Sequence, residues 1–185
     1  MKAIVCNAFG DLSQLKLAKM DEPTCGPNDV LIEVRFATVS FMDWLMTDGG
    51  YQMKPSLPYV PGTDAAGIVK AVGKNVIRFT PGDRVATSTW YGAYCEVMRA
   101  PEGSCSRIPD GVSDLDAANI MYSYGSAHYG LVGRANLKAG ETLLVTGATG
   151  GVGLAALEIG KLLGARVIAC VGSEGKRELA MQYGA

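Results

Sequence analysis

The sequence predicts an α/β protein, in which a barrel-like antiparallel β domain precedes the first part, β-α-β-α, of a doubly wound parallel sheet. Three observations support this fold class. Short apolar runs separated by glycine and proline turns fill the first two thirds of the 185 residues. Strand-like and helix-like patterns alternate in the last third. A glycine-rich turn joins the first strand of that last third to the helix after it.

The antiparallel domain is predicted from a series of short strands with turns between them. The clearest strand has one apolar set (Val30, Ile32, Val34 and Phe36) that alternates with a second set (Leu31, Glu33 and Arg35). This period of two predicts a strand with one buried face. Further strands are predicted in KAIVC, LKLAKM, TDAAGIVKAVG, GDRVATST and GAYCEVMRA. The segment SFMDWLMTDGG predicts one short helix that ends at Gly49-Gly50.

The pattern changes near Asp114, where helix signals begin. The segment SDLDAANIM has a serine N-cap followed by acidic residues, and YSYGSAHYGLVGRAN predicts the next helix despite its three glycines. The strands TLLVTG and RVIACVG then alternate with the helices GGVGLAALEIGKLLGA and SEGKRELAMQYGA. We place the domain boundary after residue 122, so that residues 1–122 form the β domain and residues 123–185 form the parallel α/β part.

Composition and charge exclude several classes of function. The chain has 17 lysines and arginines against 18 acidic residues, so neither a nucleic-acid surface nor a polybasic membrane contact is expected. The apolar runs are too short for a membrane span or a signal peptide. The five cysteines are scattered and form no CxxC pair, which predicts reduced thiols in a cytoplasmic protein rather than disulfides or a zinc knuckle.

The segment VTGATGGVG, residues 145–153, predicts a phosphate-binding turn, because it follows a strand and opens a helix. Glycine permits the tight turn, lets the backbone approach a pyrophosphate and allows close helix–sheet packing. The N-terminus of the helix then offers free N–H groups to the anion. The predicted cofactor-binding residues are Gly147, Ala148, Thr149, Gly150, Gly151, Val152 and Gly153. The alternative is a glycine-rich turn that binds nothing; an ATP-type loop is excluded, since no Gly-Lys-Ser/Thr follows.

The residues after the second parallel strand predict NADPH rather than NADH as the cofactor. An NAD site usually places an acidic residue there to bind the ribose 2′-hydroxyl, whereas this chain has Gly172 and Ser173. Ser173 can donate to a 2′-phosphate, and Lys176 or Arg177 can neutralise it. Two alternatives stay open: Glu174 could be the ribose acid, and the two cations could form an ordinary solvated helix face.

Three stretches of the chain together resemble a known family. They are PSLPYVPGTDAAGIVKAVGKNV, PGDRVATSTWYGAYCEV and VTGATGGVGLAALEIGKLLGARVIACVGSEGKRELAMQYGA. In this order they are similar to the zinc-independent quinone oxidoreductases of the medium-chain dehydrogenase/reductase superfamily. The resemblance implies a GroES-like catalytic domain, then a Rossmann domain, with the active site in the cleft between them. It also implies C-terminal truncation, since the family's Rossmann sheet has six strands and two are predicted here.

The positions that bind zinc in zinc-dependent members of the superfamily differ in this chain. Those members carry Gly-His-Glu where this chain has Gly62-Thr63-Asp64, and a cysteine three residues before an aspartate where it has Ser40-Phe41-Met42-Asp43. A zinc site needs deprotonated cysteine and neutral histidine ligands held together. The sole histidine, His128, is at neither position and is predicted to be packed within a helix. No metal is therefore expected.

The resemblance also implies which side chains act in catalysis. Hydride would pass from the reduced nicotinamide ring to an electron-poor carbon of the substrate. Ser40 stands where quinone reductases usually have asparagine, and Tyr51 stands where they have a loop tyrosine that could donate a proton or orient the substrate. Tyr51 and Ser40 are therefore the catalytic candidates. The alternative for Tyr51 is packing on Pro55 or Pro58, and Asp43 is expected to fix its loop rather than to catalyse.

The helix YSYGSAHYGLV departs from the family as well. Ala127 stands where relatives usually carry a threonine that touches the nicotinamide. Tyr124 or Tyr129 could replace that contact as an aromatic wall of the cleft, or could pack as ordinary helix residues. Tyr129 is included among the predicted cofactor-binding residues.

The predicted function is NADPH-dependent reduction of a quinone or another α,β-unsaturated carbonyl (an enone), by hydride transfer without a metal. An enoyl-thioester reductase is the alternative with the same chemistry. An inactive fragment that acts as a binding or scaffold module is the alternative of another class. The expected partners are a small-molecule substrate and either a second copy in a homodimer or a complementing C-terminal polypeptide. The exact substrate and the activity of this chain alone stay open, since part of the site is expected in the missing segment.

Overall fold

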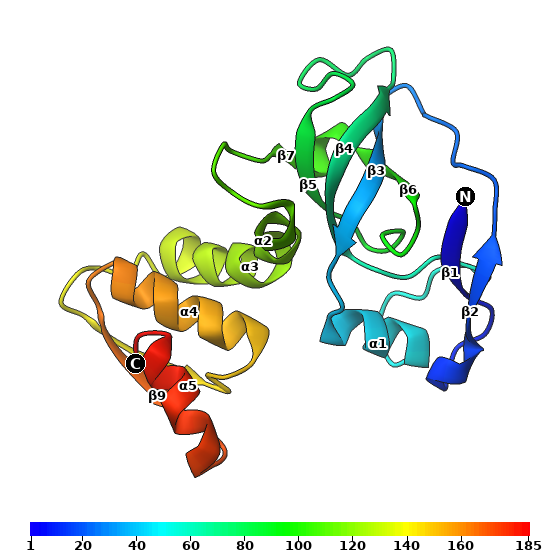
Figure 1. Cartoon of the computed structure of the whole chain (residues 1–185). Coiled ribbons are helices and arrows are strands. Elements are labelled where there is room, and N and C mark those ends of the chain that lie inside the picture. Colours follow the sequence, from blue (N-terminus) through cyan, green and yellow to red (C-terminus); the bar gives the residue numbers. More distant parts are fainter. The chain divides into compact units, whose positions relative to one another are not determined.

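The computed structural model describes residues 1–185 and divides into two compact units, Met1–Asn119 and Ile120–Ala185. The first unit holds most of the strands, and the second alternates helices with two further strands (Figure 1). The sequence places the boundary after residue 122, which lies within η3 (Ile120–Tyr124), the helical segment that opens the second unit.

The first unit contains seven antiparallel strands, in agreement with the short apolar runs of the sequence. They are β1 (Lys2–Cys6), β2 (Leu15–Lys19), β3 (Asp29–Ala37), β4 (Asp64–Val72), β5 (Arg84–Ser88), β6 (Val97–Pro101) and β7 (Cys105–Arg107). Strand β1 pairs with β2, and the other five form a sheet in the order β6-β3-β4-β5-β7. Single bridges, Ala3 to Cys95 and Cys6 to Tyr59, join β1 to two loops of this unit.

Strand β3 shows the predicted alternation only in part. Val30 and Ile32 are buried, but Leu31 between them is buried too, and Phe36 is 43% exposed. The register against β4 shifts between Leu31 and Ile32 and again between Val34 and Phe36. The first shift leaves Lys70 of β4 without a partner and the second leaves Arg35 of β3 without one, so only the second interrupts the alternation along β3.

The core of the first unit packs against this five-stranded sheet. It consists of Val30, Ile32, Ala65, Val69, Phe79, Val85, Ala93, Met98, Ala100 and Cys105. The predicted short helix is present as α1 (Phe41–Asp48), and it ends where expected, at Gly49 with a left-handed φ of 81°. Two single 3-10 turns, η1 (Leu12–Gln14) and η2 (Glu102–Ser104), complete the unit.

Helix α2 (Asp114–Asn119) is joined to the sheet by an ion-pair network around Asp114, which is 8% exposed. The Arg84 guanidinium donates from Nε at 2.9 Å and from Nη2 at 2.7 Å to Asp114 Oδ1, and Arg35 donates to Oδ2 at 3.1 Å. Burial alone would raise the pKa of Asp114, but the hydrogen bonds and charges of Arg84 and Arg35 outweigh it and lower this pKa. Thr38 also donates to the carbonyl of Ala118 at 2.8 Å.

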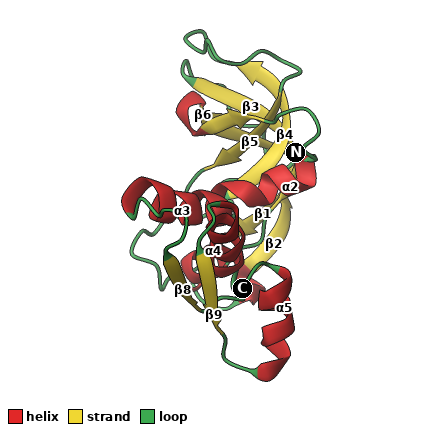
Figure 2. Cartoon of the chain, turned by 90° about the vertical axis from the view of Figure 1, so that its left-hand side faces the viewer, coloured by secondary structure: helices red, strands yellow, loops and turns green.

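The second unit has the predicted order of elements. After η3 come α3 (Gly125–His128) and the π-helical turn η4 (Tyr129–Arg134). Then β8 (Thr142–Thr146), α4 (Gly151–Leu162), β9 (Arg166–Cys170), the 3-10 turn η5 (Glu174–Lys176) and α5 (Arg177–Gln182) follow. Strands β8 and β9 pair in parallel, with Thr142 opposite Arg166 and Thr146 opposite Cys170. The predicted β-α-β-α order is therefore confirmed (Figure 2).

The parallel sheet of the second unit is covered on one face. Val145, Ala148, Leu157 and Ala180 form its small core, together with partly buried residues that include Leu143 and Val167. On the opposite face Leu144 is 59% exposed and Ile168 is 39% exposed. Parallel sheets are normally covered on both faces. None of the helices combines the length and the apolar character that crossing a membrane requires.

Replacing Asp114 with asparagine should destabilise the first unit, because the two arginines keep their charge and lose their acceptor. We expect a loss of about 1–3 kcal/mol in the free energy of unfolding, moderated by the partial exposure of both guanidinium groups. Since the folded-state pKa of Asp114 is lowered, the stabilisation is present above the ordinary carboxyl range and is lost as the pH falls through the folded-state pKa.

Denaturant titrations followed by tryptophan fluorescence would measure this change, since both tryptophans, Trp44 and Trp90, belong to the first unit. Asp110→Asn is the matched control, because Asp110 is exposed and forms no ion pair. Equal stability of the two variants at neutral pH would contradict the proposed role of Asp114.

Candidate cofactor and active site

The glycine turn lies at the carboxyl ends of the two parallel strands, between β8 and α4. The N–H of Ala148 donates to the carbonyl of Cys170 at 3.2 Å, which joins the turn to the end of β9. The N–H of Gly150 donates to the carbonyl of Gly147 at 3.0 Å, and Gly150 is the N-cap of α4. The turn is therefore fixed by backbone hydrogen bonds alone, at the edge of the sheet where doubly wound folds bind their ligands.

Three glycines of the turn meet three different requirements. Gly147 has φ of +60°, a left-handed conformation that favours glycine. At Gly153 a Cβ atom would lie 2.5 Å from the carbonyl oxygen of Gly147, so this glycine lets α4 pack closely against the turn. At Gly151 a Cβ atom would lie 2.9 Å from Oγ of Ser123, on η3. The sequence does not predict this contact, because Ser123 is far from the turn along the chain and belongs to no motif that includes it.

The N-terminus of α4 is free to bind an anion. Gly150 has no side chain to cap it, and the first-turn N–H groups of Gly151, Val152 and Gly153 have no acceptor within the helix. The 12-residue helix directs the positive end of its dipole toward the same point. Residues 147–153 thus form a turn with exposed backbone N–H groups, the kind of feature that binds phosphate groups in dinucleotide folds.

The second predicted cluster follows β9 and surrounds the short turn η5. The backbone carbonyl of Ser173 accepts the N–H of Lys176 at 3.1 Å, and the Ser173 hydroxyl makes no capping hydrogen bond. Arg177 pairs with Glu174 at 3.2 Å, with both side chains exposed. Exposed pairs of this kind contribute little to stability and exchange readily. Glu174 is therefore paired with Arg177, while the side chains of Ser173 and Lys176 form no ion pair or capping hydrogen bond.

Tyr124 and Tyr129, on the helical segment before β8, differ in their contacts and in their exposure to solvent. Tyr124 donates to the carboxylate of Glu158 on α4, and this bond, with burial second, raises the pKa of Tyr124 to about 12. Tyr129, the predicted cofactor-binding residue, is 63% exposed. His128 is exposed, so the prediction that it is packed within a helix is wrong; Ala127 takes the buried position of that turn.

In the first unit, Ser40 begins helix α1 through a capping box with Asp43. The N–H and the hydroxyl of Ser40 donate to Asp43 Oδ2 at 2.8 and 2.7 Å, and Ser40 Oγ accepts the N–H of Asp43 at 3.3 Å. Asp43 therefore fixes this segment, as expected. A hydroxyl has one hydrogen, so Ser40 can donate to a substrate only after its bond to Asp43 has been exchanged.

Tyr51, the other catalytic candidate, follows the C-terminus of α1. Its N–H donates to the carbonyl of Leu45 at 3.2 Å, which places it just beyond the Gly49 cap. The side chain is half-buried, and no hydrogen bond engages its hydroxyl. Tyr51 thus has a hydroxyl that is available as a donor.

Tyr94 is a residue of this site that sequence reasoning missed. Its hydroxyl donates to Asp43 Oδ2 at 2.9 Å and lies 3.2 Å from the carbonyl of Thr38. Burial, and then the charge of Asp43, raise the pKa of Tyr94. The ring lies over Gly62, whose φ is +96° and where a Cβ atom would lie 2.4 Å from a ring carbon. The partners are 51 residues apart in the sequence, so no local pattern could reveal the contact.

The two positions that carry zinc ligands in zinc-dependent members hold hydroxyl groups that are already engaged. Ser40 donates to Asp43, and Thr63 donates to Asp64 Oδ2 at 2.8 Å. No group of three or more histidine, cysteine, aspartate or glutamate side chains is placed to hold a metal ion. Zinc sites take cysteine and histidine ligands, so this donor set does not fit zinc.

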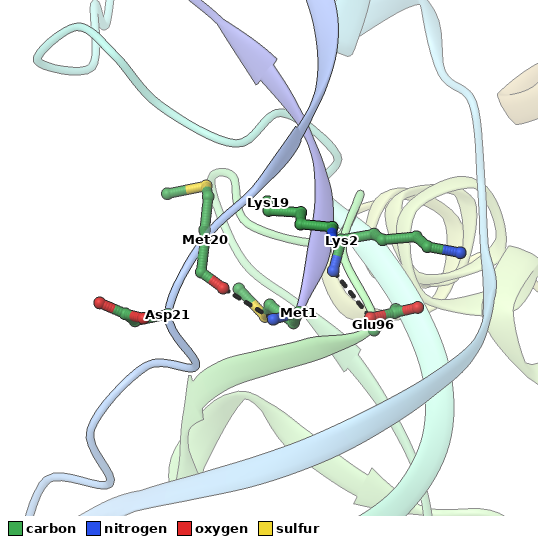
Figure 3. Close-up of a pocket in the computed structure, with 6 residues that line it drawn as sticks. All are labelled: Met1, Lys2, Lys19, Met20, Asp21 and Glu96. Carbon is green, nitrogen blue, oxygen red and sulfur yellow. Dashed lines mark hydrogen bonds between the residues drawn. The ribbon is translucent and has the colours of Figure 1, made fainter.

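A separate pocket of about 580 Å³ lies at the N-terminus of the first unit. Met1 donates through its amino group to the carbonyl of Met20 at 2.7 Å, and the N–H of Lys2 donates to Glu96 at 2.7 Å (Figure 3). Lys19 and Asp21 complete its lining. None of the predicted site residues is among these, so this pocket is not part of the candidate site.

A β domain of this topology, followed by a dinucleotide-type β-α-β unit, defines the class of protein as a medium-chain dehydrogenase/reductase. The chain belongs to the alcohol dehydrogenase GroES-like domain family, whose profile matches residues 26–145. Within that class its similarity is to quinone oxidoreductases, as the sequence predicts, and the α/β fold class is confirmed.

Three relatives illustrate the similarity. Human quinone oxidoreductase is 37% identical over 187 residues, which cover 100% of this chain and 57% of the relative. A mycocerosic acid synthase-like polyketide synthase from Mycobacterium tuberculosis is 36% identical over 175 residues, which cover 95% of this chain and 8% of the relative. The structure of Escherichia coli quinone oxidoreductase complexed with NADPH has a TM-score of 0.91 and 30% identity, covering 100% of this chain and 57% of that one. The chain thus spans little more than half the length of the human and bacterial quinone oxidoreductases.

Replacing Gly153 with alanine should destabilise the glycine turn, because the added Cβ would meet the carbonyl oxygen of Gly147, a backbone atom that cannot rotate away. We expect a loss of about 1–3 kcal/mol and lower protection of the α4 amides. Hydrogen exchange measured by mass spectrometry would report on this unit directly. Gly125→Ala is the control, because a Cβ there meets nothing within 4 Å; equal protection in both variants would refute the packing argument.

Proposed function

We propose that this chain is part of an NADPH-dependent oxidoreductase that reduces a quinone or another α,β-unsaturated carbonyl without a metal. The observation that carries the proposal is the glycine turn with its free N–H groups at the start of α4. The human quinone oxidoreductase and the E. coli enzyme complexed with NADPH support it. NADPH, when bound, supplies the hydride that reduces an electron-poor carbon of the substrate.

Each part of the second unit has a role in holding this cofactor. The N–H groups of Gly151, Val152 and Gly153 bind the pyrophosphate, and the absence of side chains at the turn lets the phosphates approach the backbone. Ser173 and Lys176 bind the ribose 2′-phosphate through a hydroxyl and an ammonium group, and Arg177 joins them by exchanging Glu174 for the phosphate. Tyr129 contributes an exposed aromatic ring to the same site.

The first unit supplies the hydrogen-bond donors that act on the substrate. Tyr51 donates through its free hydroxyl, either to orient the carbonyl oxygen or to protonate it after hydride transfer. Ser40 is held by Asp43 and acts by exchanging that hydrogen bond for one to the substrate. Both residues lie at the two ends of α1, so that a single helix positions them.

An enoyl-thioester reductase is the second candidate, and the similarity to part of a polyketide synthase favours it. The chemistry is the same, and the acceptor differs in the acyl-thioester group that it carries. The two candidate functions can be separated by testing a quinone, an enone and an enoyl-thioester as acceptors. NADPH oxidation is followed by absorbance for each acceptor. A folded chain that binds NADPH but reduces none of the three acceptors would instead favour a binding or scaffold role.

We further propose that the open face of the β8–β9 sheet is covered in the working protein, by a second copy in a homodimer or by a complementing polypeptide. The exposed Leu144 and Ile168 support this proposal. Native mass spectrometry distinguishes a monomer, a homodimer and a heteromeric complex. The five free cysteines support a reducing compartment, and we infer the cytoplasm.

The chain should bind NADPH more tightly than NADH. Lys176→Ala should weaken NADPH binding by about tenfold, since it removes a charge-assisted contact to the 2′-phosphate, and should leave NADH binding unchanged. Fluorescence titration of both nucleotides measures the two affinities. Lys74→Ala changes the net charge equally at an exposed site of the first unit and serves as the control. An equal loss of affinity for NADPH and for NADH in Lys176→Ala would refute the assignment of Lys176 to the 2′-phosphate.

Tyr51→Phe should lower turnover by about a hundredfold, because the hydroxyl that donates to the substrate is lost, while the affinity for NADPH stays the same. Steady-state rates combined with NADPH titration measure both effects. Tyr91→Phe removes an exposed hydroxyl from the same unit and is the matched control. Turnover of Tyr51→Phe equal to that of the control would show that Tyr51 only packs in its loop.

A further inference from the structure

Two buried carboxyl groups of the first unit each have an oxygen atom with no hydrogen-bond partner. Asp43 is 4% exposed and Asp64 is fully buried, and Oδ1 of each lacks a donor. Buried carboxylates are normally paired with a cation or surrounded by donors, because an isolated buried charge is strongly unfavourable. No lysine, arginine or histidine forms an ion pair with either group. This pair of acids therefore needs a physical explanation.

The two acids differ in how well their surroundings accommodate a negative charge. Asp43 Oδ2 accepts three hydrogen bonds, two from Ser40 and one from Tyr94, and it lies in the first turn of α1, where the helix dipole favours an anion. Asp64 Oδ2 accepts one hydrogen bond, from the hydroxyl of Thr63, and the hydroxyl of Ser88 also faces this carboxyl group. The negative charge is therefore far better accommodated on Asp43 than on Asp64.

We propose that the buried carboxyl groups of Asp43 and Asp64 form a proton-binding site, in which Asp64 is held as a neutral carboxylic acid. A neutral Asp64 buries no charge and has an O–H group of its own to donate.

The groups that face Asp64 from each neighbouring element agree with this assignment. Burial raises the pKa of Asp64. The hydroxyls of the adjacent Thr63 and of Ser88, at the end of β5, lower this pKa, and the charge of Asp43 on α1 raises it. Tyr94, from the loop before β6, faces the same cluster, and its own pKa is raised by burial and by Asp43, so that it remains a neutral donor. No cationic group opposes these effects.

The proton-binding site makes the surroundings of Ser40 sensitive to pH. Ionisation of Asp64 would put a negative charge beside the carboxyl group of Asp43 inside the unit, and repulsion between them would destabilise the start of β4 and the start of α1 together. The protonation state itself does not depend on the proposed reductase function. A loss of substrate orientation by Ser40 at high pH would rest on that function.

The sign of the pH dependence follows from the raised pKa of Asp64. The folded protein holds this proton to higher pH than the unfolded chain does, so the stabilisation is complete below the unfolded-state pKa and is lost as the pH rises through the folded-state pKa. Asp64→Asn is a neutral replacement that cannot lose a proton. The wild-type unfolding constant should therefore rise relative to that of Asp64→Asn, by up to tenfold per pH unit between these two pKa values.

Two measurements on the full chain test the proposal. The first is the infrared spectrum of the wild type at about pH 6, where exposed aspartates and glutamates are ionised; a band from a protonated carboxylic acid is expected, and its absence would overturn the proposal whether or not any variant folds. The second is the ratio of unfolding constants for wild type and Asp64→Asn between about pH 4 and pH 8, with Asp110→Asn as the control at an exposed site.

The competing explanation is that both acids are ionised and bind a cation. In that case Asp64→Asn would be less stable than the wild type at every pH, and added Mg²⁺ or Ca²⁺, which prefer oxygen ligands, would stabilise the wild type and not the variant. A flat ratio of unfolding constants, equal to that of Asp110→Asn, would show that Asp64 titrates like an exposed residue. Either result would refute the proton-binding site.

Discussion

A single carboxylate oxygen, Oδ2 of Asp43, holds the functional part of the first unit together. It accepts hydrogen bonds from the backbone and hydroxyl of Ser40 and from the hydroxyl of Tyr94. The Tyr94 ring in turn lies over Gly62, and the Tyr94 N–H donates to the carbonyl of Pro61 at 2.9 Å. Helix α1, the loop before β4 and the loop before β6 are thus fixed by one acceptor and the residues around it.

This arrangement explains how the first unit orders its site with hydroxyl groups where related enzymes place metal ligands. Thr63 and Ser40 each bind a neighbouring aspartate and so satisfy the polar groups locally. The geometry comes from a network in which every donor has an acceptor, and such networks are sensitive to the loss of any one member. Oδ1 of Asp43 and Oδ1 of Asp64 are acceptors without a donor, and the proposed proton on Asp64 removes the need for a buried charge on that group.

The parts of the structure that could be predicted from the sequence are those set by local requirements. The glycine turn is one, because Gly147 needs a left-handed backbone and Gly153 has no room for a Cβ, and both needs follow from a strand that turns directly into a helix. The capping box at Ser40 is another, since its two members are three residues apart. Alternating strands and helices likewise follow from periodicity alone.

The features that sequence reasoning missed depend on contacts between distant residues. Asp114 meets Arg84 and Arg35 across 30 and 79 residues, and Tyr94 meets Asp43 across 51. The bulge at Arg35 of β3 interrupts the alternation of side chains along the strand, and the sequence pattern shows no sign of it. Strand β7 has three residues, and two of them are exposed, so it has no apolar pattern to detect. In each case the feature depends on a residue or strand that is distant in the sequence.

At the start of α4 and at Asp43 the polar contacts come from hydrogen-bond donors without an ion pair, whereas Asp114 is paired with two arginines. In the second unit, the first-turn N–H groups of α4 have no acceptor within the helix, and in the proposed function the exposed Lys176 and Arg177 bind the 2′-phosphate. In the first unit, the buried carboxyl group of Asp43 accepts hydrogen bonds from a serine and a tyrosine. Donors held by backbone geometry and packing are screened little by salt, whereas exposed charges are screened strongly. Salt should therefore reduce the preference for NADPH over NADH much more than it affects the binding of the pyrophosphate or the order of the Ser40 segment.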